Sequence, residues 1–182
     1  MMKENIILGI DPGTNIMGYG VIKKREHKIY FLYLDVILLN RIDDHNMKLK
    51  KIFEKTSELI KRFTANEIAV EAPFFGKNPQ SMLKLGRAQG AAIIAGMTHN
   101  IPITEYAPKK IKMAITGNGN ASKEQVAGML INMLSIGKKP KYLDSTDGLA
   151  AAVCHALQNN PFNNEKKQSW EQFIKKNPGR IK

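Results

Sequence analysis

The sequence predicts an α/β fold in which a mixed five-stranded sheet is flanked by helices. Three strand-like segments follow one another at the start of the chain, which is typical of an antiparallel meander with its first strand in the middle of the sheet. Two further apolar segments each follow a segment with helical periodicity, so we expect their strands to return parallel to the first. The chain has 182 residues, which is enough for one domain with a sizeable core but short for two.

The first predicted strand ends in a carboxylate. Residues 6–10 are apolar on both faces, which indicates cover on both sides, and Asp11 follows at once, before a Pro12-Gly13 turn. A carboxylate at the end of a buried strand stays charged only if it is paired, hydrogen-bonded or holding a metal. Asp11 therefore requires a partner from elsewhere in the chain.

The remaining elements follow from periodicity and from turn residues. Apolar residues at three- and four-residue steps predict an amphipathic helix over 46–64. The other predicted elements are strands over 16–22, 29–39, 68–70 and 101–106, a hairpin turn over 23–28, a loop over 74–79, a helix over 80–98, a short helix opened by Pro108, a helix with a capping box of Ser122 and Gln125, and a last helix over 144–157.

The predicted helix over 80–98 has a smooth side. Gly86, Gly90, Ala91 and Ala95 have little or no side chain, so another backbone can come close to them. We therefore expect this helix to pack tightly on the sheet or on a second subunit.

The composition favours a nucleic-acid-binding protein. A formal net charge of +12 attracts polyanions, although a basic solubilising surface, a ribosome-associated protein or a membrane-surface protein would share that charge. The single cysteine, Cys154, excludes an internal disulfide and fits a reducing compartment. No segment has the length of a membrane span or of a signal-peptide core, so we expect a cytoplasmic protein without a membrane partner.

Four carboxylates are predicted to meet at one edge of the sheet. Glu71 follows a short strand as Asp11 does, and the carboxyl ends of parallel neighbours share an edge. Asp144 and Asp147 begin the last helix three residues apart, so they lie on one face. Each has an ordinary explanation by itself: a helix cap, a turn residue or a lysine pair. Together, in a basic protein, they predict a site for one or two divalent cations such as Mg²⁺, which supports phosphodiester hydrolysis.

In order and spacing these residues resemble the RuvC-type Holliday-junction resolvases, over about residues 5–158. The resemblance rests on residues 7–14, 18–20, 71, 74, 77–78, 83–86 and 144–150. It implies an RNase H-like fold, a homodimer, and Mg²⁺-dependent symmetric nicking of four-way DNA junctions in recombination and repair. It also implies the RuvA–RuvB branch-migration machinery as a partner.

By position, the resemblance implies roles for single residues. Asp11, Glu71, Asp144 and Asp147 match the family's acidic metal site and are the expected catalytic residues. Lys112 and Lys123 match basic residues that contact DNA near that site, where a lysine can also steady the phosphate transition state.

The resemblance also points to a DNA-binding loop. Phe74 matches an aromatic residue that stacks on opened bases at the crossover, since an aromatic face can stack on any base. Lys77, Lys84 and Arg87 are further DNA-binding candidates, although exposed basic residues often form only a solvated surface.

Several features depart from the family or lie outside it. Gly148 stands where the family often has alanine, and Pro73 stiffens the loop before Phe74. His155 lies on the helix face of the two aspartates, three turns on, and either supports the metal site or is a buried structural residue. We expect residues 1–159 to form the nuclease domain and 160–182 a basic tail.

Three other functions would draw on some of the same residues. An actin-like ATPase or sugar kinase needs two related domains and a second phosphate loop, for which this chain is too short. An RNA-processing nuclease on the same fold would have a similar metal site. A non-catalytic module that binds branched DNA would not need four intact carboxylates.

Overall fold

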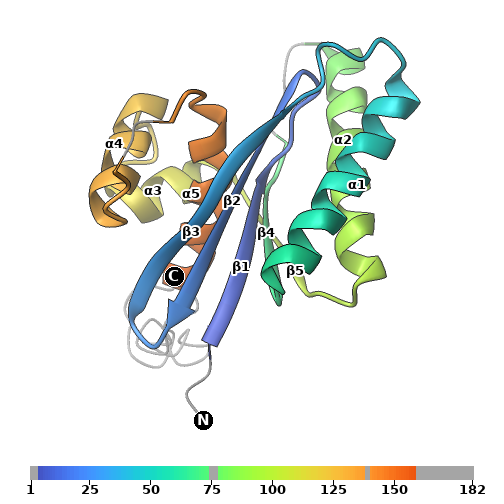
Figure 1. Ribbon diagram of the computed structural model, residues 1–182. Coiled ribbons are helices and arrows are strands. Elements are labelled where there is room, and N and C mark those ends of the chain that lie inside the picture. Colours follow the sequence, from blue (N-terminus) through green and yellow to red (C-terminus); the bar gives the residue numbers. More distant parts are fainter. Residues whose placement is uncertain (1–3, 74–77, 138–139, 159–182) are drawn as a thin grey trace, which may run out of the picture.

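A five-stranded sheet forms the middle layer of the computed structural model, which describes residues 4–73, 78–137 and 140–158. Two helices, α1 and α2, cover one face, and α5 lies on the other face with α3 and α4 packed against it (Figure 1). The strands are β1 (Glu4–Asp11), β2 (Ile16–Arg25), β3 (Lys28–Leu38), β4 (Glu67–Glu71) and β5 (Ile103–Tyr106). The helices are α1 (His45–Phe63), α2 (Pro79–Thr98), α3 (Pro108–Thr116), α4 (Lys123–Met133) and α5 (Asp144–Gln158).

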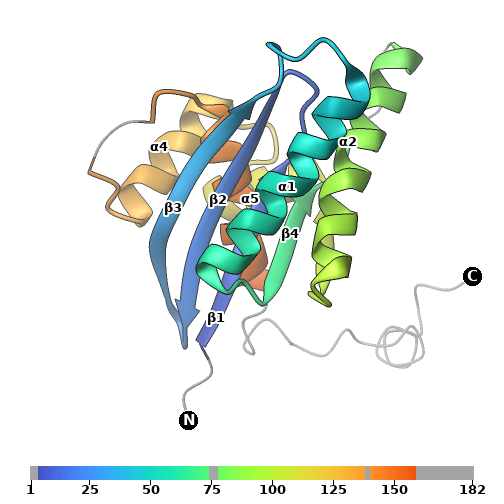
Figure 2. The same cartoon turned by 45° about the vertical axis from the view of Figure 1, so that its right-hand side comes forward.

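The order of the strands is β3-β2-β1-β4-β5, which confirms the mixed sheet and the central place of β1. β1 is antiparallel to β2 and parallel to β4, and β4 is parallel to β5. Asp11 is the last residue of β1 and Glu71 the last of β4, so the carboxyl ends of two neighbouring parallel strands bring both acids to one edge. Figure 2 shows β4 in green behind α1, on the side toward α2.

The hairpin between β2 and β3 is tighter than predicted. Lys23, Lys24 and Arg25 pair with β3, and only Glu26 and His27 form the turn. Lys24 is buried because its Nζ donates a 2.6 Å hydrogen bond to the carbonyl of Ala156, near the end of α5. A polar sequence can therefore extend a ladder where its side chains find partners.

The helix starts agree closely with their sequence signals. Asn78 caps α2 by accepting hydrogen bonds from the backbone N–H groups of Gln80 and Ser81, and Pro79 takes the first helical position. Ser122 and Gln125 form the expected capping box at α4.

Of the smooth side predicted for α2, Ala95 is buried within this chain, whereas for Gly86 and Gly90 close packing on a second subunit stays a prediction. Both glycines face open space, and the buried face instead carries Ala88, Ala92 and Ala95. Small residues occur all round this helix, so their spacing alone does not distinguish the covered side.

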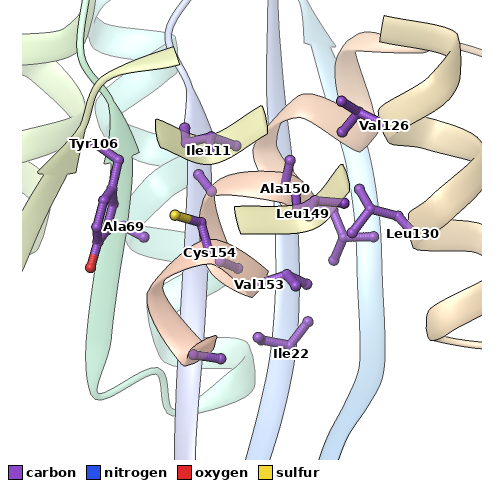
Figure 3. Packing of buried hydrophobic residues seen from close by; sticks show 14 of the residues in the cluster. Ile22, Ala69, Tyr106, Ile111, Val126, Leu130, Leu149, Ala150, Val153 and Cys154 are labelled. Carbon is purple, nitrogen blue, oxygen red and sulfur yellow. The ribbon is translucent and has the colours of Figure 1, made fainter. Parts of the chain in front are cut away.

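The two faces of the sheet have separate hydrophobic cores. The core under α1 and α2 contains large side chains from β1, β2 and β4. The other core surrounds α5, which contributes Leu149, Val153 and Cys154 (Figure 3). The same view shows Ile111 of α3 and Val126 of α4 next to α5.

α5 lies so close to the sheet that glycine backbone replaces side chains in the contact. A Cβ on Gly18 would lie 1.8 Å from the carbonyl oxygen of Asp144, and one on Gly20 would lie 2.3 Å from Cα of Leu149. A Cβ on Gly148 would lie 2.6 Å from the carbonyl oxygen of Gly18. This contact explains why glycine stands at position 148, where the family often has alanine.

Candidate active site

The four carboxylates predicted from the sequence meet at the edge where β1 and β4 end. One carboxylate oxygen from each of Asp11, Asp144 and Asp147 lies within 4.8 Å of the others. Glu71 lines the cavity beside this cluster together with Asp11 and Asp147, and the cavity has a volume of about 80 Å³. The strand ends and the first turn of α5 therefore converge as the topology predicted.

At the start of α5, hydroxyl groups and not the two aspartates bond to the backbone. The hydroxyl groups of Ser145 and Thr146 each donate a 2.6 Å hydrogen bond back, to the carbonyls of Tyr142 and Leu143 respectively. Across the described ranges, neither aspartate of this helix accepts a hydrogen bond from a backbone N–H group. The helix-cap explanation for these aspartates is therefore not supported.

Lys123 is directly bonded to the acidic cluster. Its Nζ donates a 2.6 Å hydrogen bond to Oδ2 of Asp147 and lies 3.7 Å from Oδ1 of Asp144. Burial disfavours the charge of Lys123, but the hydrogen bond to Asp147 and the nearby carboxylates outweigh it, so the pKa of Lys123 is raised. Lys112 lines the same cavity from α3. The family resemblance implied that both lysines lie near the site, but it did not indicate the ion pairs of Lys123.

The carboxylates raise the cost of one another's charge. Burial raises the pKa of Asp11 well above its ordinary value, and the charges of Glu71 and Asp147 add to this. Burial, helped by the charge of Asp147, raises the pKa of Glu71 to about 7. Burial also raises the pKa of Asp147, against the opposing effect of its hydrogen bond with Lys123. Such a cluster favours either bound protons or a bound cation.

The other residues singled out from the sequence lie apart from this cavity or outside the described ranges. Lys84 and Arg87 are exposed on α2 and do not line the cavity. Phe74 and Lys77 lie outside the described residues.

His155 is a structural residue at the far end of α5. It is buried, with Nδ1 2.8 Å from the hydroxyl oxygen of Tyr106 and Nε2 2.8 Å from Oε2 of Glu67. Glu67 is the first residue of β4, at the end opposite Glu71. Of the two roles left open for His155, these contacts favour the structural one.

Several residues of the site were missed by sequence reasoning. The apolar walls of the cavity come from Pro108, Ile111, Val126 and Ala150, whose residue types carry no chemical signal. Gly18 was missed as well: it pairs with Asp11 across the β1–β2 ladder and also contacts the backbone of Asp144. Its alternation with Gly20 along a strand was the available sign of a close backbone approach.

Among the described residues, no helix has the length and apolar character needed to cross a membrane.

Comparison with known proteins connects this site to one enzyme family. The family model for crossover junction endodeoxyribonuclease RuvC matches residues 7–155. The chain is 59% identical to the RuvC crossover junction endodeoxyribonuclease of Christiangramia forsetii, over 100% of this chain and 95% of the relative. It is 54% identical to that of Bacteroides fragilis, over 100% and 98% of the two chains.

Solved structures agree with the sequence comparison. The structure of Thermus thermophilus RuvC in complex with a Holliday junction substrate matches with a TM-score of 0.79 and 30% identity, covering 88% of this chain and 96% of that one. This match confirms the RNase H-like architecture implied by the resemblance. With its acidic cluster at the carboxyl ends of parallel strands, the chain belongs to the RuvC family of crossover junction endodeoxyribonucleases.

Proposed function

We propose that this protein resolves four-way DNA junctions by paired symmetric nicks in recombination and repair, using Asp11, Glu71, Asp144 and Asp147 as ligands of one or two Mg²⁺ ions. The observation that carries the proposal is the cluster of three aspartates with ligand oxygens within 4.8 Å, set in a chain of net charge +12. The positive charge of the chain attracts DNA. A cation held by the aspartates would offset their negative charge, so that a DNA phosphate could approach the cluster.

The residues of the cluster fit a hard divalent cation. Every candidate ligand atom is a carboxylate oxygen, which suits Mg²⁺ and offers neither nitrogen nor sulfur to a softer metal. Burial and the neighbouring carboxylates raise the pKa of Asp11 and Glu71 despite the opposing charge of Lys123, which favours a bound cation. Ions bound there supply activation of the attacking water and stabilisation of the leaving oxygen.

We assign Lys123 two successive partners. Its Nζ holds Oδ2 of Asp147, a residue that is also a candidate metal ligand, so a cation held by this carboxylate would compete with the ion pair. The released ammonium group is then available to the phosphate of the DNA. Lys112, on the opposite helix of the cavity, offers a second positive charge toward the same phosphate.

Paired nicks require two copies of the site, and we propose a homodimer that provides them. The described chain holds one acidic cluster, whereas symmetric cutting of a junction needs two. Exposed apolar side chains on α2 support an interface on this helix: Leu83, Ile94 and Met97 are 66%, 57% and 63% exposed. We also propose, from the family resemblance alone, a cytoplasmic enzyme that receives junctions from RuvA–RuvB.

The DNA-binding roles of residues outside the cavity remain part of the proposal. We assign Phe74 to stacking on an opened base, and Lys77, Lys84 and Arg87 to the DNA backbone. Phe74→Ala is expected to bind a junction but to cut it poorly, because binding relies on the basic surface while cutting needs the opened crossover. Cutting at the normal rate would instead indicate that Phe74 packs at a dimer contact.

A single assay tests the proposed function. A synthetic four-way junction, a linear duplex and a structured RNA of matched length are incubated with the full-length protein and Mg²⁺. The proposal predicts paired, symmetric nicks in the junction and little cutting of the other two. Cutting of RNA alone would instead identify an RNA-processing nuclease, and binding of the junction without cutting would identify a non-catalytic module.

A further inference from the structure

A second, more open hollow adjoins the acidic cavity. It has a volume of about 370 Å³ and is lined by Pro108, Lys109, Lys112, Gly119 and Asn120; we call it the lysine groove. Pro108 and Lys112 also line the acidic cavity, so the two hollows share a wall. The groove therefore continues the surface that a substrate in the acidic cavity must follow.

The charges of the two hollows are opposite. Asp11, Glu71 and Asp147 line the acidic cavity, whereas no carboxylate is among the residues that line the lysine groove. Neither Lys109 nor Lys112 forms an ion pair within the described part of the chain. The ammonium group of Lys109 is thus available to an external anion, whereas the charge of Lys112 also acts on Glu71 and Asp147 of the acidic cavity.

The far wall of the groove is a loop fixed by its own hydrogen bonds. The side-chain oxygen of Asn118 accepts a 2.9 Å hydrogen bond from the backbone N–H of Asn120, and the backbone N–H of Asn118 donates to Oγ1 of Thr116 at 3.1 Å. Gly119 packs against α3, where a Cβ would lie 3.3 Å from the carbonyl oxygen of Lys109. The groove is therefore formed before any ligand arrives.

We propose that the lysine groove binds the phosphate next to the scissile phosphate on the cleaved DNA strand. The inference rests on the proposed function, since it takes the scissile phosphate to lie in the acidic cavity. A strand with one phosphate in that cavity carries its neighbouring phosphates into adjoining space, and beside Lys112 this adjoining hollow offers the ammonium group of Lys109 and the amide side chain of Asn120. Lys109 and Asn120 are the binding residues that this assignment adds to the site.

The test measures junction binding by the full-length protein in an Asp11→Asn background, in which cutting is expected to be lost. Lys109→Gln is added to this background, with Lys110→Gln as the matched control. Lys110 lies on the same helix, but its Nζ is 5.0 Å from the centre of the Tyr106 ring and does not line the groove. We expect Lys109→Gln to weaken binding roughly tenfold at low salt and to reduce the salt slope by about 1. We expect Lys110→Gln to change binding much less.

A scan of the DNA backbone then locates the contact. Each phosphate around the cleavage position is replaced in turn by an uncharged methylphosphonate. The loss caused by Lys109→Gln should disappear when one direct neighbour of the scissile phosphate is neutral, and should persist for every other replacement. A loss that persists at all positions, that vanishes only at a distant phosphate, or that Lys110→Gln reproduces would overturn the assignment.

Failure of this inference is separable from failure of the proposed function. If the unsubstituted protein does not cut a four-way junction with Mg²⁺, the proposed function is wrong whatever Lys109 does. If the protein cuts the junction but Lys109→Gln binds all DNAs normally, only the lysine groove is wrong.

Discussion

α5 and α1 cover opposite faces of the same sheet but contact it in different ways. α5 touches β1 and β2 through backbone, with Gly18 within contact of the Asp144 carbonyl. α1 packs through branched side chains such as Ile52, Leu59 and Ile60. Side chains can repack after a small change, whereas two backbones in contact have no such freedom. The rigid contact belongs to the helix that carries two of the four candidate metal ligands.

This difference suggests how the chain sets the geometry of its site. Gly18 is the cross-strand partner of Asp11 and also contacts the backbone of Asp144. The spacing between these two aspartates is therefore fixed by a residue without a side chain. α1 itself contributes no carboxylate to the acidic cluster.

Of the changes that test this difference between the two faces, Gly18→Ala should have the largest effect on junction cutting. The added Cβ would lie 1.8 Å from the Asp144 carbonyl oxygen, so α5 must move and carry Asp144 with it. We expect about 100-fold slower cutting, the order of loss for a misplacement of about 1 Å, and roughly 1–3 kcal/mol lower stability. Junction cutting by protein shown to be folded by circular dichroism checks the first effect, and urea unfolding checks the second. Normal cutting would refute the positioning role of Gly18.

A change of pH should have an effect of intermediate size on the free energy of unfolding, and this effect should come from Glu71 on the α5 side of the sheet. The pKa of Glu71 rises from its ordinary 4.5 to about 7 in the folded protein, so the folded state binds more protons than the unfolded state between these values. Without metal, the free energy of unfolding should fall as the pH rises through this window. Saturating Mg²⁺ should restore it at pH 8.

Glu71→Gln provides the control for this pH effect. The amide does not titrate, so the fall in stability between pH 5 and pH 8 should become shallower, and at pH 8 without metal the variant should be the more stable protein. Urea unfolding in a chelating buffer at both pH values measures this. An equal fall in the variant and the parent would mean that the crowding of Glu71 by burial and Asp147 is not its source.

Ile52→Val should have the smallest effect. Ile52 is fully buried on the face of α1 that meets the sheet, and the loss of one methylene there costs about 0.5–1.5 kcal/mol. Because the neighbouring side chains can relax without moving the acidic cluster, we expect an unchanged cutting rate per folded molecule. A cutting defect similar to that of Gly18→Ala would remove the distinction between the two faces.

The sequence predicts the candidate site well where topology alone decides. Asp11 and Glu71 each end a strand, and the rule for parallel strands places such ends together. The spacing of Asp144 and Asp147 on one helix places them on one face. These relations do not depend on how closely the layers pack.

Packing decides the features that the sequence did not predict. The ion pairs of Lys123 depend on how α4 lies against the first turn of α5, which residue types do not fix. Which small residues of α2 meet the sheet was not predictable, because small residues occur on both sides of that helix and Gly86 and Gly90 contact nothing else, through a Cβ position, in the part of the chain that the structure describes. The role of Gly18 depends on a layer spacing that becomes apparent only in three dimensions.

The central claim is that the acidic cluster is the metal site of a junction resolvase, and Asp11→Asn tests it most directly. The substitution replaces a charged carboxylate, which is a candidate metal ligand, by a neutral amide of nearly the same shape. Mg²⁺ binding by calorimetry and cutting of a synthetic four-way junction are measured on the same preparation, together with junction binding. We predict weakened Mg²⁺ binding, no detectable cutting, and junction binding at least as tight as in the parent. Cutting at the normal rate with Mg²⁺ would contradict the assignment.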